Sequence, residues 1–262
     1  GVGVVKRFNI DSAGVVLNGS LDLGQIMGVD KGRLHTERGQ RVGQQVGGAA
    51  VDGFLGNDVA AVLGRNCAMN ARINLVSSPK KQMMSGVAYT VKARGGDNLA
   101  LHAALNLAGE GDVIVVSNEE DSTRSLIGEV MMSYLRYTKK IAGIVLDGPI
   151  RDIDEIGKWD FPVYCTGTTP GGPDKEGPGE INVPIACGGV SVMPGDIILA
   201  DPDGVIVIPQ KDASTILKDA LAFQAADEAK AIAARNGTAK RDWVEKSLKE
   251  KGFEIIDGIY EP

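Results

Sequence analysis

The sequence has few of the residue types from which many catalytic sites are built. Its 262 residues include only two histidines and three cysteines, and aromatic residues make up 5%. Two distant histidines exclude a Ser-His-Asp triad and a zinc-binding His-Glu-x-x-His motif. The cysteines, Cys67, Cys165 and Cys187, form no Cys-x-x-Cys pair. We therefore expect buried thiols in a reducing compartment rather than a zinc site or disulfides.

Long apolar runs and an excess of positive charge are also missing. No run approaches the roughly 18–20 residues that span a bilayer, and no basic segment followed by an apolar one indicates a secretory signal. The net charge of −6 argues against nucleic acid as a partner. We expect a cytoplasmic protein that binds neither membranes nor nucleic acid.

The middle of the chain alternates between strand and helix patterns. Apolar strands are predicted over 86–93, 113–116 and 144–146, and helices over 58–63, 99–107 and 125–140. Asp97 or Asn98 is the expected N-cap of the second helix, and Asn57 or Asp58 that of the first. The order β-α-β-α-β predicts an α/β protein with a partly parallel sheet.

The flanking regions differ from this middle part. Residues 1–54 are glycine-broken and are predicted to form an irregular N-terminal arm. Residues 55–235 form the predicted catalytic domain, and 236–262 a helical tail. After residue 160 short strands are expected at 161–165, 181–185, 189–192, 196–200 and 205–208, followed by charged helices at 213–236 and 241–251. The glycine- and proline-rich segment 171–179 lacks the lysine-hydroxyl ending of a phosphate cradle, so we expect a surface or interface loop.

A charged cluster follows the strand at 144–146. An Asp147-Gly148-Pro149 sequence predicts a tight turn, after which come Arg151, Asp152, Asp154 and Glu155. Arginine offers a planar fork for a carboxylate, and carboxylates are ligands for a cation such as Mg²⁺. The alternative is a solvated turn that opens a helix, where acids are favoured at the N-terminus.

Gly128-Glu129-Val130-Met131 lies near the start of the helix predicted at 125–140. Unpaired N–H groups of a first helical turn bind anions, and glycine permits close approach of the backbone. If this turn faces Arg151, the two hold one substrate carboxylate together. The alternative is a helix interior with an exposed glutamate. His102 fits a core or interface position better than a ligand, and His35 lies in the N-terminal arm.

Several motifs occur in one order over about residues 55–235: Gly96-Asp97-Asn98-Leu99-Ala100-Leu101-His102, Gly111 to Val116, Gly143 to Asp152, Cys187 to Val190, Pro194-Gly195-Asp196 and Asp201 to Val205. Together they resemble the RraA-like family, which includes class II 4-hydroxy-4-methyl-2-oxoglutarate and 4-carboxy-4-hydroxy-2-oxoadipate aldolases. The resemblance implies an α/β/β sandwich of swivelling-domain type. It also implies homotrimers or homohexamers with active sites between subunits.

The family resemblance also implies roles for individual residues. Aldolase members carry a glycine about twenty residues before Arg-Asp-x-x-Asp/Glu. Here Gly128 precedes Arg151 by 23 positions, a residue or two more than the pattern, which the segment 134–140 is expected to absorb. Asp152 is implied to bind a divalent metal, Mg²⁺ or Mn²⁺, directly, with Glu129 and Glu155 contacting it through water. Arg151 would bind the keto acid and steady the enolate, and the amides of Val130 and Met131 would meet its carboxylate.

These observations predict a divalent-metal-dependent aldolase that cleaves a 4-hydroxy-2-oxo acid to pyruvate and a second keto acid, with oxaloacetate decarboxylase side activity. A further acid is expected near the metal, with Asp227 and Glu228 as candidates. One alternative is a non-enzymatic regulator that binds an endoribonuclease; the resemblance implies that an acid at Glu155 favours the enzyme. Another alternative is a sister lyase acting on a different keto or sugar acid.

Overall fold

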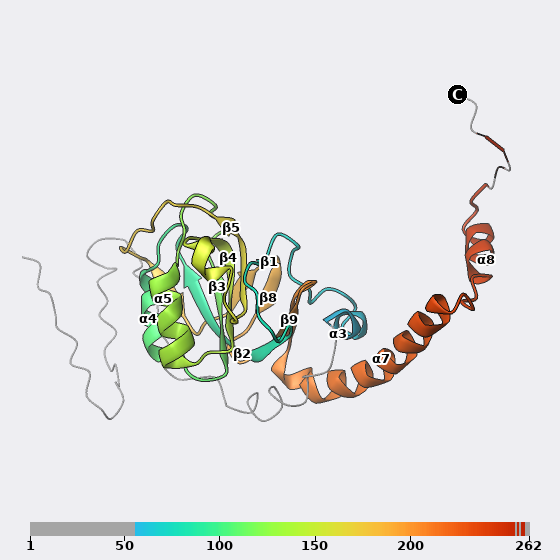
Figure 1. Ribbon diagram of the computed structural model, residues 1–262, viewed down its shortest axis with the longest axis horizontal. Coiled ribbons are helices and arrows are strands. Elements are labelled where there is room, and N and C mark those ends of the chain that lie inside the picture. The colour runs from blue at the N-terminus through green and yellow to red at the C-terminus, as the bar shows by residue number, and fades with distance from the viewer. Residues whose placement is uncertain (1–55, 255, 257, 260–262) are drawn as a thin grey trace, which may run out of the picture.

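The computed structural model describes residues 56–254, 256, 258 and 259, so the predicted arm at 1–54 and His35 lie outside the described residues. Four parallel strands and their connecting helices form the centre of the fold (Figure 1). In chain order these are β2 (Met84–Ala93), α4 (Leu99–Leu107), β3 (Asp112–Ser117), α5 (Glu129–Ser133), the π-helix η1 (Tyr134–Lys139), β4 (Gly143–Ile150), α6 (Ile153–Ile156) and β5 (Val163–Thr168). The β-α-β-α-β prediction is confirmed.

The remaining strands continue and cover this sheet. They are β1 (Asn74–Leu75), β6 (Gly179–Ile181), β7 (Ile185–Cys187), β8 (Val190–Val192), β9 (Ile197–Asp201) and β10 (Gly204–Ile208). The strand order is β1-β5-β4-β3-β2-β9-β10, with β6 also paired to β2 and β7-β8 forming a separate hairpin. The first half of β2 pairs antiparallel with β9, while its second half pairs with β6, so the sheet changes partners along one strand.

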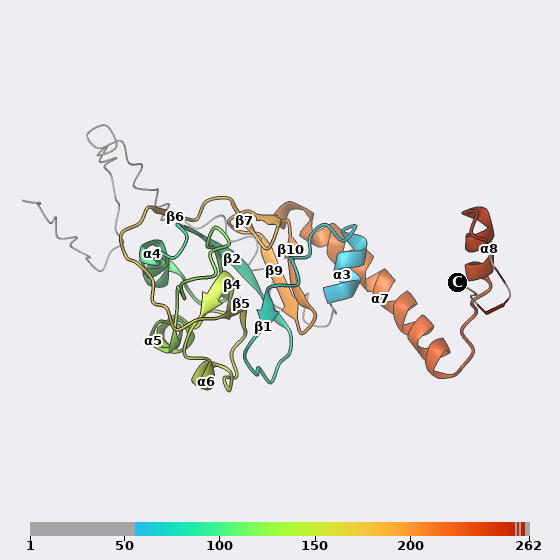
Figure 2. The ribbon, with the colours of Figure 1, turned by 90° about the horizontal axis from the view of Figure 1, so that it is seen from above.

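Two apolar layers lie on opposite faces of the parallel strands. Val113 and Val115 of β3 pack toward β7, β9 and β10, whereas Ile114 and Val116 pack toward α4, α5 and α6. Because both faces are covered, β3 is apolar along nearly its whole length instead of alternating. Figure 2 shows helices α4, α5 and α6 together on one side. The predicted α/β/β sandwich is confirmed.

The C-terminal helices leave this body. After the short 3-10 helix η2 (Gln210–Asp212), α7 (Ala213–Arg235) buries Ala213, Ile216 and Ala220 against β9, β10 and the helix α3 (Gly56–Val62). Its second half extends away and carries α8 (Trp243–Glu250) (Figure 1). Both helices match their predicted ranges to within two residues. Among the described residues no helix combines the length and apolar character needed to cross a membrane.

The expected burial of the three cysteines is confirmed. Cys67, Cys165 and Cys187 are buried free thiols. Burial raises the pKa of Cys165 to about 11, so the thiol stays protonated at neutral pH.

Two sequence-based predictions about strands are wrong. The Asp147-Gly148-Pro149 segment is not a turn but part of β4, whose register with β5 shifts between Leu146 and Pro149. The strand predicted over 181–185 is divided between β6 and β7. Asn182 adopts a left-handed φ of 55°, and Pro184 has no N–H to donate to a ladder, so pairing is interrupted there.

A nearly buried ion pair fixes the irregular part of β4. The Asp147 carboxylate accepts hydrogen bonds from Arg72 Nε at 3.0 Å and Nη2 at 2.9 Å, and from the Gly188 N–H at 2.8 Å. Its side chain is 5% exposed, whereas that of Arg72 is 35% exposed. The contact joins β4 to the turn between β7 and β8. Arg72 also reaches Glu120, which is 70% exposed.

We expect Asp147→Asn to lower the free energy of unfolding by about 2–3 kcal/mol, because it removes one partner of a largely buried, bidentate pair. Glu120→Gln is the matched control, since it removes the exposed partner of the same arginine and should cost less than about 1 kcal/mol. Urea unfolding of both variants measures the difference. Equal losses would show that burial of Asp147 does not decide the strength of the pair.

Candidate active site

The candidate site lies at the carboxyl edge of the parallel strands. Strands β2, β3, β4 and β5 run in the same direction, so their ends at Ala93, Ser117, Ile150 and Thr168 lie on one edge of the sheet. The segments that follow them include Gly128, Arg151 and the 169–178 loop. This is the edge at which open α/β sheets bind ligands.

Gly128 is the N-cap of α5, so the helix begins at Glu129. The predicted start at Ser125 is wrong. The preceding residues instead hydrogen-bond beside the end of β4. The Leu126 N–H donates to the Pro149 carbonyl, and the Arg151 N–H donates to the Ile127 carbonyl at 3.1 Å. These bonds draw 125–127 out of the helix and bring its first turn to Arg151.

The approach of this turn to Arg151 and Asp152 requires a glycine. A Cβ on Gly128 would lie 2.8 Å from Arg151 Cγ and 2.9 Å from Arg151 Nε, and closer still to the Asp152 carboxylate. The Glu129 N–H donates to Asp152 Oδ2 at 2.9 Å. Gly128, Glu129, Arg151 and Asp152, predicted from separate motifs, therefore meet at one place.

Asp152 adopts a left-handed conformation, with φ at 60° and ψ at 39°, and is the N-cap of α6. Aspartate tolerates this region better than most residues. Its Oδ2 lies 3.6 Å from Arg151 Nε, and the side chains of Arg151 and Asp152 are 48% and 42% exposed. One guanidinium and one carboxylate are thus fixed near each other and open to solvent.

The helix between the two halves of the site contains an irregularity. After five α-helical residues the chain continues as the π-helix η1, and Lys140 ends it with a left-handed φ of 53°. A π-helix accommodates an extra residue within a helical path. This π-helix lies in the segment expected to absorb the extra length between Gly128 and Arg151, and the match of Gly128 to the glycine of the family pattern stays a prediction. Val130 and Met131 lie in the first helical turn, before the first bond from the Met132 N–H to the Gly128 carbonyl.

An open cavity of about 490 Å³ adjoins Arg151 and Asp152. Its other lining residues are Ile153 and Asp154 from α6, and Thr168, Thr169 and Pro170 from the end of β5. Asp154 belongs to the charged cluster singled out in the sequence, whereas the β5 residues were not predicted. The register that pairs Ile150 with Thr168 brings them to the site. The 171–179 loop also reaches it, because a Cβ on Gly172 would lie 3.6 Å from Arg151 Nη1.

The other predicted acids have different surroundings. The Glu155 carboxylate accepts a hydrogen bond from Trp159 Nε1 at 3.3 Å and lies 3.5 Å from Lys158 Nζ. Both partners follow Glu155 closely in the sequence. Its contact with a metal through water stays a prediction. Asp227 and Glu228 lie on α7, and Asp227 pairs with Lys230 at 3.7 Å. That part of α7 extends away from α5 and α6 of the same chain (Figures 1 and 2).

The donor groups at the site restrict which metal ion fits. Within the described residues, no three histidine, cysteine, aspartate or glutamate side chains gather into a group that could enclose a metal ion. Asp152 offers one partly exposed carboxylate beside the cavity. A single oxygen ligand suits a hard cation that keeps most of its water, such as Mg²⁺ or Mn²⁺, and does not suit zinc in a closed site.

Buried polar side chains hold the neighbouring loops. Asp97 accepts the N–H of Leu99, the first residue of α4, at 3.0 Å, and its second oxygen accepts the N–H groups of Glu176 at 2.7 Å and Gly177 at 2.9 Å. Of the two predicted N-caps, Asn98 occupies the N-cap position; its side chain makes no capping bond and donates from Nδ2 to the Leu126 carbonyl at 2.8 Å. These contacts connect the start of α4 with both segments that border the site.

The surroundings of Asp97 shift its pKa. Burial by itself would raise the pKa of this carboxyl, but the three backbone N–H donors and Arg94 outweigh it and hold the pKa below its ordinary value. His102 on α4 is partly buried, and burial together with the charge of Lys175 lowers its pKa. The imidazole is therefore neutral at pH 7, in keeping with the expected core or interface position.

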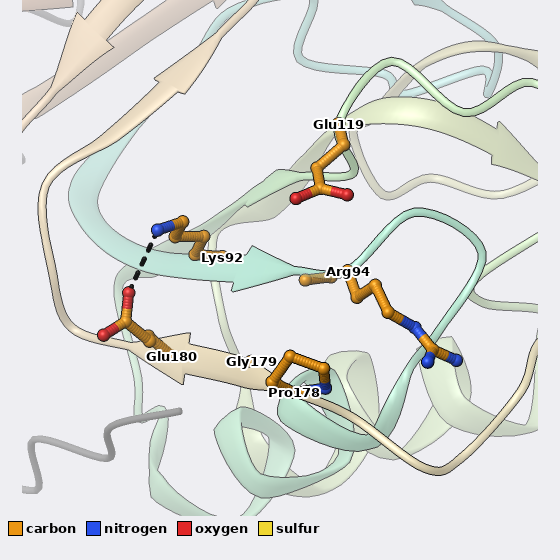
Figure 3. A pocket seen from close by; sticks show the side chains of 7 residues that line it. Lys92, Arg94, Glu119, Pro178, Gly179 and Glu180 are labelled. Atoms are coloured by element: carbon orange, nitrogen blue, oxygen red, sulfur yellow. Dashed lines mark hydrogen bonds and ion pairs between the residues drawn. The ribbon is translucent and has the colours of Figure 1, made fainter. Parts of the chain in front are cut away.

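A second cavity, of about 180 Å³, lies at the end of β2 (Figure 3). Lys92 Nζ lies 3.2 Å from a carboxylate oxygen of Glu180, and the Gly95 N–H donates to Glu119 at 3.1 Å. Arg94, which also lines it, pairs with Asp97 at 3.3 Å. The cations of this smaller cavity pair with acids at 3.2 and 3.3 Å, whereas Arg151 lies 3.6 Å from Asp152 beside a cavity of about 490 Å³, so we take the cavity beside Arg151 as the candidate for binding an anionic substrate.

The fold and this edge define an α/β/β protein with a guanidinium–carboxylate site at the ends of parallel strands. The family model described as RraA-like, Aldolase/RraA, matches residues 51–207. The chain therefore belongs to the RraA-like family.

Two curated relatives carry the provisional name 4-hydroxy-4-methyl-2-oxoglutarate aldolase. The one from Halalkalibacterium halodurans is 42% identical over 69% of this chain and 88% of its own length. The one from Ectopseudomonas mendocina is 37% identical over 50% of this chain and 79% of its own length.

Two solved structures have the same fold. RraAS2 of Streptomyces coelicolor, described as an unusual member of the RNase ES inhibitor RraA family, has a TM-score of 0.61 at 26% identity. It covers 70% of this chain, and 95% of its own chain is matched. The RNA-processing inhibitor RraA from Thermus thermophilis has a TM-score of 0.53 at 27% identity. The match covers 58% of this chain and 91% of the Thermus chain.

The lowered pKa of Asp97 gives a pH-dependent contribution to stability. We expect Asp97→Asn to cost about 2–3 kcal/mol at pH 7, because an amide nitrogen then faces two backbone donors. A depressed folded-state pKa contributes stability above the unfolded value of about 3.9, and this contribution is lost as the pH falls through the folded value. The difference between wild type and variant in chemical unfolding should therefore shrink below about pH 4. Asp203→Asn, at an exposed turn, is the control. A difference that does not depend on pH would contradict the proposed role of the charge.

Proposed function

We propose that this protein is a divalent-metal-dependent aldolase that releases pyruvate from a 4-hydroxy-2-oxo acid. The observation that carries the proposal is the close packing of Arg151 and Asp152 against Gly128 at the start of α5. It holds the start of α5 beside a cation and a carboxylate that line one open cavity. The aldolase names of the relatives support the same reaction class.

The keto-acid end of the substrate is assigned to Arg151 and the start of α5. First-turn N–H groups of Val130 and Met131 would donate hydrogen bonds to the substrate carboxylate, because such groups have no carbonyl partner within the helix. Arg151 would direct its guanidinium at the keto oxygen. In retro-aldol cleavage the C4 hydroxyl loses its proton, the C3–C4 bond breaks and its electron pair forms the pyruvate enolate. Arg151 stabilises that developing oxyanion.

Protons must leave O4 and later reach C3 to give pyruvate. We assign Glu129 to ordering the water that takes the first proton and returns one to the enolate. Asp152 would hold Mg²⁺ or Mn²⁺, with Glu129 contacting it through water, and Glu155 is a second candidate for such a contact. When bound, the ion supplies Lewis-acid stabilisation of negative charge on the substrate oxygens. Decarboxylation of oxaloacetate leaves the same enolate, so we propose it as a side activity.

The open side of the cavity is consistent with completion by a second subunit. We propose a homotrimer or homohexamer in which a neighbouring copy borders Arg151 and supplies a further acid. Asp227 and Glu228 are candidates because their helix extends away from its own sheet.

A non-enzymatic role is the second candidate function. It is favoured by the structural similarity to proteins described as RNA-processing inhibitors. An endoribonuclease partner would then replace the small-molecule substrate. Glu155 supports the enzyme, since the family resemblance implies that the regulator lacks an acid there. Binding to a purified endoribonuclease, without pyruvate release from any oxo acid, would favour the regulator.

We expect the wild type to release pyruvate from 4-hydroxy-2-oxo acids with Mg²⁺ or Mn²⁺ and to lose this activity in chelator. Asp152→Asn should weaken Mn²⁺ binding by more than about tenfold, because it removes the carboxylate charge. Calorimetric Mn²⁺ titration measures binding, and coupled reduction of pyruvate measures activity. Asp203→Asn controls for the loss of one negative charge. The proposal fails if chelator has no effect on pyruvate release, or if no substrate in the panel yields pyruvate.

Gly128→Ala should reduce kcat/KM by about 10²-fold or more, since a small displacement of Arg151 and Asp152 misaligns the reacting groups. The backbone at Gly128 has φ −139° and ψ −168°, which alanine adopts without strain. The loss should therefore exceed what any change in stability explains, as checked by thermal unfolding and steady-state kinetics on the same samples. Gly258→Ala, where a Cβ would have nothing within 4 Å, is the control. Unchanged kinetics in Gly128→Ala would rule out the close packing as a requirement.

A further inference from the structure

Asn98 occupies the N-cap position of α4, but its side chain does not cap that helix. An asparagine at this position usually accepts an N–H group of the first helical turn. Here Asp97 accepts the Leu99 N–H, and Asn98 Nδ2 donates to the Leu126 carbonyl at 2.8 Å. The side chain therefore forgoes its local partner for one that lies 28 positions away in the chain.

This arrangement leaves one buried polar atom unpaired. Asn98 is 2% exposed, and among the described residues its Oδ1 has no hydrogen-bond partner. An unpaired buried acceptor costs stability, because the oxygen has lost its water without a replacement. Leu126 is fully buried, so water cannot take the place of the bond from Nδ2. A departure from local preference that costs stability is characteristic of functional positions.

The contacts of Asn98 fix the start of α5. Its Nδ2 lies 3.6 Å from Met131 Sδ in addition to its bond with the Leu126 carbonyl, so one amide group touches the chain on both sides of Gly128. The N–H groups assigned to the substrate carboxylate, those of Val130 and Met131, belong to this turn. Asn98 thus holds the turn from the side of α4, opposite the contacts that it makes with the end of β4.

We infer that Asn98 is a positioning residue, which orients the first turn of α5 so that the N–H groups of Val130 and Met131 meet the substrate carboxylate. The inference rests on the proposed function, which it deepens. Asn98 does not belong to the described residues that line the cavity beside Arg151. Loss of its contacts should weaken the binding of the keto-acid carboxylate, whereas Asp152 keeps the charge that would bind the metal.

Exchange of the C3 protons of pyruvate in deuterated water, followed by NMR, tests the inference on the full chain with Mg²⁺. The reaction needs the enolate and the carboxylate site but no second product. Asn98→Ala removes the amide without adding a charge, and Asn98→Asp replaces the nitrogen by an oxygen in the same shape. We expect KM for pyruvate to rise by about tenfold or more in both variants at pH 8. Calorimetric titration should show that Mn²⁺ affinity changes by less than about threefold, since no ligand is lost.

Asn98→Asp should recover at low pH, whereas Asn98→Ala should not. Burial and the neighbouring Asp97 carboxylate raise the pKa of a carboxyl group at position 98, and its protonated form can donate to the Leu126 carbonyl as the amide does. KM relative to the wild type should therefore fall by about threefold or more between pH 8 and about pH 5.5. Asp97 stays ionised over this range because its pKa is lowered, and Arg94 stays charged. His102 titrates in wild type and variant alike.

Thr90→Val is the matched control. The buried Thr90 hydroxyl donates to the Val183 carbonyl at 2.6 Å, so this variant also removes a buried bond from a side chain to the backbone. Thr90 alternates with Tyr89 and Val91, which pack toward α4 and α5, and it therefore faces the other side of the sheet. KM for pyruvate should stay within about twofold of the wild type, whatever the change in thermal stability.

Thermal unfolding shows which variants are folded, and Asn98→Ala decides alone if Asn98→Asp does not fold. An unchanged KM in the Asn98 variants, an equal rise in Thr90→Val, or no recovery of folded Asn98→Asp at low pH would overturn the inference and leave the proposed function standing. A loss of Mn²⁺ affinity as large as the rise in KM would also overturn it, because the side chain would then act through the metal site. A wild type that neither exchanges pyruvate protons nor releases pyruvate from any oxo acid refutes the proposed function, and the inference with it.

Discussion

The hydrogen bond from the Glu129 N–H to Asp152 Oδ2 is the contact on which the arrangement of the site depends. It joins the start of one crossover helix to the segment that leaves the next strand, two places separated along the chain by a helix and a strand. Only a glycine at 128 permits the approach, because any side chain there would overlap Arg151. The Asp152 carboxylate is thereby held by a backbone N–H, and the backbone of Arg151 is held by its bond to the Ile127 carbonyl.

The surrounding structure holds the two partners of this bond in place. The shifted register in β4 is held by the Arg72–Asp147 pair, and it determines how the strand reaches Arg151. On the other side, Asn98 holds the Leu126 carbonyl while Asp97 holds the loop that follows β5. The α/β/β architecture brings the strand ends together, and buried polar contacts fix the final positions.

Much of the fold could be predicted from the sequence because local patterns and the final packing agree there. Strand β3 has the continuous apolar run of a buried strand, and helix α7 is rich in alanine and other residues that favour helices. The predictions failed where contacts distant in the chain override local preference. Asp147-Gly148-Pro149 has the composition of a turn, yet pairing with β3 and β5 makes it strand. Arg151, Asp152 and Gly128 were accessible to sequence reasoning as motifs, whereas Thr168 and Thr169 enter the cavity only through the β4–β5 register.

The π-helix between Tyr134 and Lys139 has a consequence for recognising related sites. Its wider turn takes up chain length between two fixed points, so the number of residues separating Gly128 from Arg151 is a property of the helix and not of the chemistry. Relatives with shorter, regular helices can present the same constellation at a different spacing. A search that demands one exact interval would discard such proteins, whereas one that asks whether a glycine-capped helix start meets an Arg-Asp strand end would retain them.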